Sequence, residues 1–347
     1  MKNNSFLKLF VVSVLVVSCT RKPESTLEMF DASTELQGEV CSFDSLMLGN
    51  PYQILLMDSL LLIADPYEEN FLSVVDLKRG RLVRRALKEG KGPDELLPPV
   101  DISLTKDTIL GVYERTPRRF STYTIADILR TEYPRQQKRI SFDDHPGRLQ
   151  LLGNERFIAV GPYENGCLGL YDREGKRLGE YGRYPKEAER FASRFSRFLA
   201  YQSRMATNPD GKRLITAGNF CDRIVFYEET AGKISETKTY FFRDAALSPK
   251  DDNNIVWNPE CLHYFSQVQA TGQNVYILYE GYTIGEEAKI RQSESAANRL
   301  LVFDWNGNPV KAYAFDRLLA NFCVSPDGKT LYGIVRNPEP AIVKYTL

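Results

Sequence analysis

Histidine is nearly absent from this sequence. His145 and His263 are the only two among 347 residues. The usual zinc sites need several Cys or His ligands at short spacing. No Ser, His and Asp spacing singles itself out as a catalytic triad either. A zinc site and a triad hydrolase are therefore disfavoured.

An excess of charge of either sign is also missing. The chain holds 45 basic and 45 acidic residues, so its formal net charge is zero. A nucleic-acid partner would require a basic excess on one face of the protein. We therefore expect no nucleic acid among the partners.

The N-terminus carries an apolar run that is too short to remain as a membrane-spanning helix. Lys2 and Lys8 precede the run Leu9–Val17, and a small residue followed by Cys19 closes it. This order is typical of a bacterial lipoprotein signal. The sequence predicts a signal peptide over residues 1–18 and lipidation of Cys19; the alternative is a buried N-terminal strand with a chance cysteine.

Lipidation would determine where the protein is found. Acyl chains on Cys19 bury many methylene groups at about 0.8 kcal/mol each, which attaches the protein firmly to a membrane. No aspartate follows Cys19 directly, so we expect the outer membrane of the cell envelope, on its periplasmic or its surface side. Residues 19–36 are polar and show no strand pattern, which predicts a flexible tether.

Five further cysteines lack the spacing of a redox or metal motif. They are Cys41, Cys167, Cys221, Cys261 and Cys323, and no CxxC occurs. An odd number leaves at least one thiol free or paired between chains. We expect buried apolar thiols.

A six-residue apolar pattern, usually with an aromatic, recurs six times at spacings of 42 to 76 residues. Its copies are Leu72–Leu77, Phe120–Ile125, Leu168–Arg173, Ile224–Glu229, Leu300–Trp305 and Ile342–Leu347. Such periods are typical of radially repeated four-stranded sheets. Tight turns such as Pro326–Lys329 separate the strands within a repeat. The sequence predicts an all-β fold, a six-bladed β-propeller with four antiparallel strands per blade over residues 37–347.

The last repeat is one strand short, because the sequence ends at Leu347, directly after the third strand. An open strand edge promotes aggregation, so another segment should cover it. The unassigned strand-like segment is Glu39–Met47. We expect it to pair with Ala341–Leu347 and close the ring; the alternative is a strand packed elsewhere.

The connections divide the predicted propeller into two unequal faces. First-to-second and third-to-fourth turns are short. The other face carries links such as 184–200, in which apolar residues recur at helical spacing, and 280–298, in which the segment 285–298 is a candidate lid. Because rigid scaffolds carry function on loops at one end, this long-link face is the candidate binding face.

Tyr, Glu, Asn and Arg recur in the second-to-third links of that face, around the expected channel mouth. Such residues suit a peptide or a carbohydrate, by stacking and directed hydrogen bonds. The candidate ligand-binding residues are Tyr67, Tyr113, Arg118, Arg119, Tyr163, Glu164, Asn219, Asp222, Arg223, Tyr279, Tyr282 and Arg336. The alternative is ordinary solvated loops whose tyrosines pack against neighbouring blades.

Several of these features together resemble the TolB-like six-bladed propeller lipoproteins of Bacteroides-type bacteria. They are the lipoprotein signal, the six repeats, the Gly-x-Gly-Pro-x-Glu turn at 90–95 and the strand entry Ser325–Tyr332. The resemblance covers residues 37–347, although Asp94 stands where relatives often have Gly. It implies a propeller in the cell envelope and transfers no catalytic residue.

Three function classes follow from the sequence. The first is a binding module for a peptide, a glycan or an envelope protein; the second is a hydrolase or lyase with a site at the channel mouth; the third is a structural module of a surface assembly. No cofactor is expected. Calcium is the metal that the sequence leaves open, with Asp65, Glu164 or Asp222 as candidate donors.

Overall fold

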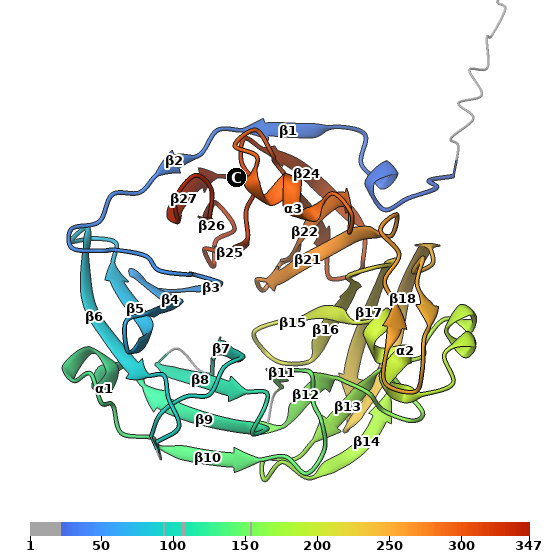
Figure 1. Cartoon of the computed structure of the whole chain (residues 1–347), viewed down its shortest axis with the longest axis horizontal. Coiled ribbons are helices and arrows are strands. Elements are labelled where there is room, and N and C mark those ends of the chain that lie inside the picture. The colour runs from blue at the N-terminus through green and yellow to red at the C-terminus, as the bar shows by residue number, and fades with distance from the viewer. Residues whose placement is uncertain (1–21, 93, 106–107, 153–154) are drawn as a thin grey trace, which may run out of the picture.

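Six β-sheets surround a central channel like the blades of a propeller in the computed structural model, which describes residues 22–92, 94–105, 108–152 and 155–347 (Figure 1). Each sheet has four antiparallel strands that follow one another from the channel outward, and one sheet carries a fifth strand. The six-bladed propeller predicted from the sequence is confirmed. The predicted signal peptide and Cys19 lie outside the described residues.

The first three blades are built from consecutive strands: β3 (Gln53–Met57), β4 (Leu60–Tyr67), β5 (Asn70–Asp76) and β6 (Arg81–Lys88); β7 (Val100–Leu104), β8 (Ile109–Glu114), β9 (Arg119–Thr124) and β10 (Lys138–Ser141); β11 (Arg148–Leu151), β12 (Phe157–Val160), β13 (Leu168–Tyr171) and β14 (Arg177–Tyr181). Blades four and five follow with β15 (Ser203–Thr207), β16 (Arg213–Gly218), β17 (Asp222–Thr230) and β18 (Lys233–Arg243), then β21 (Leu262–Ala270), β22 (Asn274–Thr283), β23 (Arg299–Asp304) and β24 (Pro309–Phe315). Blade six contains β25 (Asn321–Val324), β26 (Thr330–Val335) and β27 (Ala341–Thr346).

The recurring apolar pattern forms the third strand of every blade. In β5 the five residues Phe71–Val75 are all buried, and in β13 all four residues are buried. A third strand lies inside its sheet and faces a neighbouring blade on each side, so both of its faces are largely buried. Such a strand appears in the sequence as a continuous apolar run rather than as an alternation.

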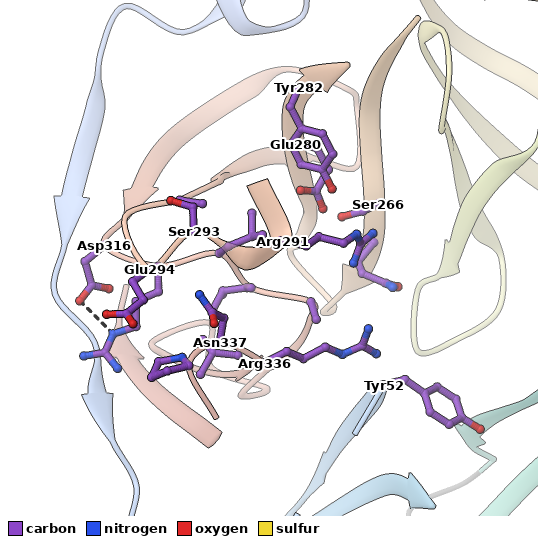
Figure 2. A pocket seen from close by; sticks show the side chains of 18 of the residues that line it. Tyr52, Ser266, Glu280, Tyr282, Arg291, Ser293, Glu294, Asp316, Arg336 and Asn337 are labelled. Carbon is purple, nitrogen blue, oxygen red and sulfur yellow. Dashed lines mark hydrogen bonds and ion pairs between the residues drawn. The ribbon is translucent and has the colours of Figure 1, made fainter. Parts of the chain in front are cut away.

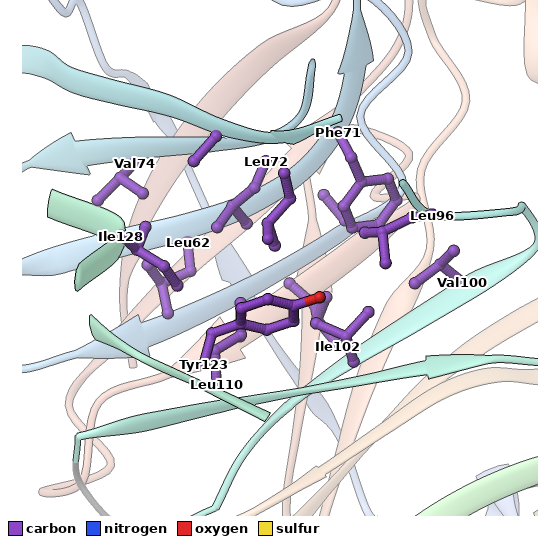
Figure 3. Packing of buried hydrophobic residues seen from close by; sticks show 14 of the residues in the cluster. Leu62, Phe71, Leu72, Val74, Leu96, Val100, Ile102, Leu110, Tyr123 and Ile128 are labelled. Carbon is purple, nitrogen blue, oxygen red and sulfur yellow. The ribbon is translucent and has the colours of Figure 1, made fainter. Parts of the chain in front are cut away.

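Apolar side chains between neighbouring blades form the core. Between blades one and two, Phe71, Leu72 and Leu96 pack with Ile102 and Leu110 in one buried cluster (Figure 3). Burial of each such side chain stabilises the fold by about 1.5–3 kcal/mol. Blade-on-blade packing therefore holds the ring together and leaves the innermost strands at the channel wall.

The N-terminal segment closes the ring as predicted. Strand β2 (Glu39–Val40) pairs antiparallel with β27 and becomes the outer strand of blade six. The ladder is shorter than the predicted Glu39–Met47, because the chain then crosses to blade one, where Asp44 bridges to Arg81 of β6. One segment thus joins the last blade to the first.

The predicted tether is more ordered than expected. Residues Leu27–Met29 form a 3₁₀ helix, η1, and Ser33–Leu36 form β1, which pairs parallel with β24 on the outside of blade five (Figure 1). The expectation that residues 19–36 contain no strand is therefore wrong for 33–36. This strand escapes sequence analysis because its two central residues are exposed, so it has no apolar pattern.

Short helices and one small hairpin occupy several connections; one helix lies in the third-to-fourth link of blade two, and the other elements lie in the long links of the opposite face. The helices are α1 (Ile125–Arg130), η3 (Lys186–Arg190), α2 (Arg194–Ala200) and α3 (Glu287–Gln292), and the hairpin consists of β19 (Ser248–Pro249) and β20 (Ile255–Val256). The helix expected over 184–200 is two helices, because Ser193 caps α2 by accepting a hydrogen bond from the Phe195 amide at 3.1 Å. None of the helices that the structure describes is long and apolar enough to cross a membrane.

The five described cysteines form no disulfide. Cys221, Cys261 and Cys323 are buried, and Cys41 and Cys167 are partly buried. Burial raises the pKa of each of these thiols. A protonated, enclosed thiol is a poor nucleophile and a poor metal ligand.

Thr26 attaches the N-terminal segment to blade four. This residue is fully buried; its amide donates to Asp222 Oδ2 at 3.0 Å and its hydroxyl donates to Asp222 Oδ1. Burial raises the pKa of Asp222, and the two hydrogen bonds from Thr26 oppose that shift. The segment therefore contacts blades four, five and six in succession.

Thr26→Val should destabilise the fold while preserving the shape of the side chain. The variant leaves one buried carboxylate oxygen of Asp222 without its hydroxyl donor, which costs about 1–3 kcal/mol. Urea denaturation followed by circular dichroism measures the free energy of unfolding. Thr34→Val is the matched control, because Thr34 is exposed on β1, and equal losses in both variants would contradict the anchoring role of Thr26.

Candidate functional site

A cavity of about 720 Å³ opens at the channel mouth on the long-link face (Figure 2). Its walls come from second-to-third links, such as Arg336–Pro338, and from connections between blades, such as Arg317–Ala320. The face chosen from the sequence therefore carries a cavity. A second cavity, of about 710 Å³, lies at the short-turn end, and Gln267 borders both.

Arginine dominates the charge of the mouth cavity. Six arginines line it, against three acidic residues: Arg115, Arg148, Arg204, Arg291, Arg317 and Arg336, with Glu280, Glu294 and Asp316. The protein as a whole is neutral. The positive charge is therefore local, and it lies in a concave, partly desolvated space where charges interact strongly.

Asp101 on β7 neutralises part of this charge. Its carboxylate accepts two hydrogen bonds from Arg115, at 2.7 Å from Nε and 2.5 Å from Nη2, and lies 3.4 Å from Arg148 Nη1. Burial alone would raise the pKa of Asp101, but the Arg115 hydrogen bond and the charge of Arg148 hold that pKa below its usual value. Asp101 is thus ionised and joins blade two to blade three.

Arg204 on β15 is the least satisfied of the arginines. Its Nε is buried and has no hydrogen-bond partner among the described residues. Burial and the neighbouring charge of Arg148 lower the pKa of Arg204 well below its ordinary value. Burial also lowers the pKa of Arg148, to about 10. The surroundings of both arginines therefore disfavour their positive charge.

Glu280 lines the same space near the end of β22. Figure 2 shows its carboxyl group beside Ser266 and Tyr282, and Asn298 Nδ2 donates to it at 3.4 Å. Burial raises the pKa of Glu280, and its hydrogen bonds oppose the shift. A protonated carboxyl group can donate a hydrogen bond as well as accept one, whereas an ionised carboxylate only accepts.

Helix α3 and the residues after it border the cavity, in the link that the sequence suggested as a lid. Arg291 on α3 pairs with Glu287 at 2.7 Å and also lines the cavity. Asn337 Nδ2 donates to the Gln292 carbonyl at 3.0 Å, which connects α3 to the blade-six link. Single polar contacts of this kind hold α3 at the mouth, rather than a buried apolar face, since no residue of α3 is buried.

Two of the twelve candidate residues chosen from the sequence line the mouth cavity, Tyr282 and Arg336. Arg336 extends into the cavity and donates from Nε and Nη2 to the Pro51 carbonyl, at 3.1 and 3.0 Å (Figure 2). This contact joins blade six to the entry of blade one. Burial lowers the pKa of Arg336.

The other candidate tyrosines lie away from this cavity. Tyr113 is buried and donates to the Pro146 carbonyl at 2.6 Å, and buried Tyr163 accepts a hydrogen bond from Tyr171 at 2.8 Å. The Cζ atom of Arg85 lies 4.0 Å from the centre of the Tyr67 ring, and the ring of Tyr279 packs against that of Phe265. These positions correspond to the alternative of tyrosines packed within and between blades.

The remaining candidates make contacts within the protein. Arg119 forms a two-point ion pair with buried Glu114, at 2.6 and 2.7 Å, and Arg118 donates to the Asp143 carbonyl. Arg223 donates to the Arg183 carbonyl, and Glu164 pairs with Arg194 at 3.1 Å. The Asn219 amide donates to the Gln202 carbonyl and its carbonyl accepts from the Tyr264 amide, while Asp222 accepts from the Thr26 amide.

The three candidate calcium donors lie on different blades. Asp65 accepts from the amides of Gly49 and Asn50 in blade one, whereas Glu164 belongs to blade three and Asp222 to blade four. Within the described part of the chain, no group of three or more His, Cys, Asp or Glu residues could hold a metal ion.

Sequence analysis missed the residues that give the mouth its charge, among them Arg115, Arg148, Arg204, Glu280 and Arg291. A signal was present for two of them: Arg148 and Arg204 are polar residues at the start of a first strand, where the channel wall begins. Comparison of the first strands of all blades, instead of the links, would have found them.

Comparison with known proteins supports the fold. A family model described as TolB-like 6-blade propeller-like matches residues 30–327. No curated protein matches in sequence. These results leave the ligand to be inferred from the chain itself.

Solved structures with the same architecture include two from Bacteroides. A protein from Bacteroides fragilis described as exported has a TM-score of 0.55 at 12% identity, and a DUF4221 family member from Bacteroides vulgatus has 0.56 at 12%; each match covers 91% of this chain and 98% of the other. Raptor from Chaetomium thermophilum has 0.53 at 10%, over 90% of this chain and 29% of that one. At these identities the likeness shows the fold alone.

Asp101→Asn should destabilise the protein by about 2–4 kcal/mol, somewhat below the range for a fully buried ion pair. The variant leaves Arg115 and Arg148 without their carboxylate. Because the folded-state pKa of Asp101 is lowered, its stabilisation is present above the unfolded pKa of about 4 and is lost as pH falls through the folded value. The difference from the wild type, measured by urea denaturation, should therefore shrink in acid.

Glu174→Gln is the control for this prediction. It removes an exposed pair with Arg173 and should change the free energy of unfolding little. A loss for Asp101→Asn that is no larger than that of Glu174→Gln, or that does not vary with pH, would show that Asp101 does not stabilise the channel wall through its charge.

Proposed function

This chain belongs to the TolB-like six-blade propeller family, and on that premise we propose that it is a binding module of the cell envelope that takes a peptide or a glycan into its mouth cavity. The observation that carries the proposal is the cavity itself. Its volume of about 720 Å³ falls within the range of small-molecule sites, about 300–1,000 Å³. Its position on the face with the long links fits the usual placement of function on a rigid scaffold.

The lining of the cavity supports a polar ligand with some apolar surface. Tyr52 and Tyr282 offer rings, while Ser266, Ser293 and Asn337 offer hydroxyl and amide groups around the same space (Figure 2). Sugars and short peptides present this mixture of flat apolar faces and hydrogen-bonding groups. The single hydrogen bond between Asn337 and the end of α3 connects two parts of the wall that would surround such a ligand.

We further propose that the protein is exported and attached to the outer membrane through a lipid on Cys19. The support is the order of basic residues, apolar run, small residue and cysteine at the N-terminus. A relative in fold from Bacteroides fragilis is described as exported. The N-terminal segment leads from blade four along the outside of the ring, so the lipid would attach at the rim and leave the channel mouth open.

Blocking the cavity should abolish ligand binding. Ser266→Trp places a large ring in the space beside Glu280, whereas Ser235→Trp places the same ring on the exposed outer strand β18. Glycan and peptide arrays identify ligands of the wild type, and calorimetry measures affinity for each variant. We expect binding to be lost in Ser266→Trp and kept in Ser235→Trp; a ligand that binds both variants equally would contradict a site in the mouth cavity.

Cys19→Ser should release the protein from the membrane. Without the thiol no lipid can be attached, so metabolic labelling with a radioactive fatty acid should fail and the protein should move to the soluble fraction. Cys41→Ser is the control, because Cys41 lies within the propeller. Labelling that survives Cys19→Ser would overturn the anchor.

A further inference from the structure

We propose that the guanidinium groups of Arg148 and Arg204 bind a carboxylate group of the ligand. This inference rests on the proposed function and specifies the class of ligand. Both residues line the mouth cavity, and they lie on β11 and β15, the first strands of adjacent blades. A group bound between them would therefore bridge blades three and four at the channel wall.

The hydrogen bonds of the two arginines leave donors for a ligand. Arg115 gives two hydrogen bonds to Asp101, so the Nε and Nη2 side of its guanidinium fork is already engaged. Arg148 has one contact with Asp101, at 3.4 Å. For Arg204 no ion pair is present among the described residues, and its buried Nε has no partner. Two guanidinium forks thus face the cavity with most of their donors unused.

Neighbouring blades show what is missing at this point. Asn321 Oδ1 accepts from the Ile54 amide at 3.3 Å, between blades six and one, and Gln53 exchanges two hydrogen bonds with Ile102, at 2.7 and 2.8 Å, between blades one and two. Asp101 then joins blade two to Arg148 of blade three. The next polar side chain of the wall is that of Arg204, whose Nε has no acceptor among the residues that the structure describes. A ligand carboxylate would continue this series of contacts.

The balance of charge points to a group with one negative charge. Around Arg204, the charged neighbours are Arg148, Arg115, Asp101 and Glu280. Three guanidinium groups thus face two carboxyl groups, which leaves one positive charge in excess when both acids are ionised. Buried cations of like charge repel each other in a medium of low polarity, and a single anion between them relieves that repulsion.

Donor shape suits a carboxylate, and the local charge favours it over a phosphate. A guanidinium group is a planar fork whose parallel N–H bonds match the two oxygens of a carboxylate. A phosphate dianion would bring more charge than the single excess can balance. The carboxylate could belong to an acidic sugar or to the C-terminus of a peptide, and both sources present the same group to the site.

Paired probes test this inference on the full chain carrying Cys19→Ser. D-Galacturonate is compared with D-galactose, and triglycine with triglycine amide, by calorimetry. We expect the acid of at least one pair to bind, and Arg204→Gln to weaken it by roughly 10- to 100-fold, as for the loss of a charged hydrogen bond. The pair that binds identifies the source of the carboxylate.

Two further variants separate binding from structure. Arg213→Gln is the matched control, because Arg213 is exposed at the start of β16 in the same blade, and it should keep the affinity of the wild type. Without ligand, Arg204→Gln should melt at the same temperature as the wild type or higher, because it removes a strained cation. An arginine with a merely structural role would give a lower melting temperature.

Several outcomes would overturn the inference. They are binding of neither acid, equal binding of acid and neutral partner, unchanged affinity in Arg204→Gln, and binding of inorganic phosphate in place of both acids. The cavity-blocking variant keeps this question apart from the proposed function. If a neutral ligand binds the wild type and is lost in Ser266→Trp, the carboxylate inference fails while the mouth cavity remains the binding site.

Discussion

Closure of the ring is the constraint on which the rest of this structure depends. Blades stabilise one another by face-to-face packing, so a gap between the last blade and the first would expose apolar faces and a strand edge. The segment around β2 removes both problems, because Glu39–Val40 completes blade six and Asp44 then pairs with the edge of blade one. The contact of Arg336 with Pro51 joins the same two blades beside the channel.

A closed ring forces the first strands of all blades toward one axis, and this creates the site. Their side chains line a cavity at each end of the ring, and the polar ones among them are partly removed from water by the surrounding wall, so they need hydrogen-bond partners within it. Gln53 and Asn321 meet this condition by bonding to backbone groups of the neighbouring blade. Arg148 and Arg204 have fewer such partners among the described residues, so the incompletely hydrogen-bonded part of the wall lies between blades three and four.

Strand order and ring closure were predictable from the sequence, because they depend on local signals. A third strand packed on both sides is mostly buried and tends to be apolar, and a Pro-Asp-Gly turn restricts the backbone by itself. The same reasoning failed for β1, whose pairing with β24 consists of backbone hydrogen bonds beneath exposed side chains. A strand without an apolar face leaves no periodicity in the sequence.

The site was less predictable than the fold, for a related reason. Tyrosine and arginine in a link suggest a ligand, yet Tyr113 and Arg119 use their polar groups to hold links against the blades, through Pro146 and Glu114. An isolated residue type does not distinguish the two uses. The two uses differ in whether a buried donor has an acceptor within the protein. This depends on residues that are far apart in the sequence, as Arg148 and Arg204 are in this chain. Charge at the channel therefore becomes visible only once the ring places the first strands together. The Nε of Arg204, which has no partner within the described part of the chain, is the feature on which the proposed preference of the mouth for a carboxylate rests.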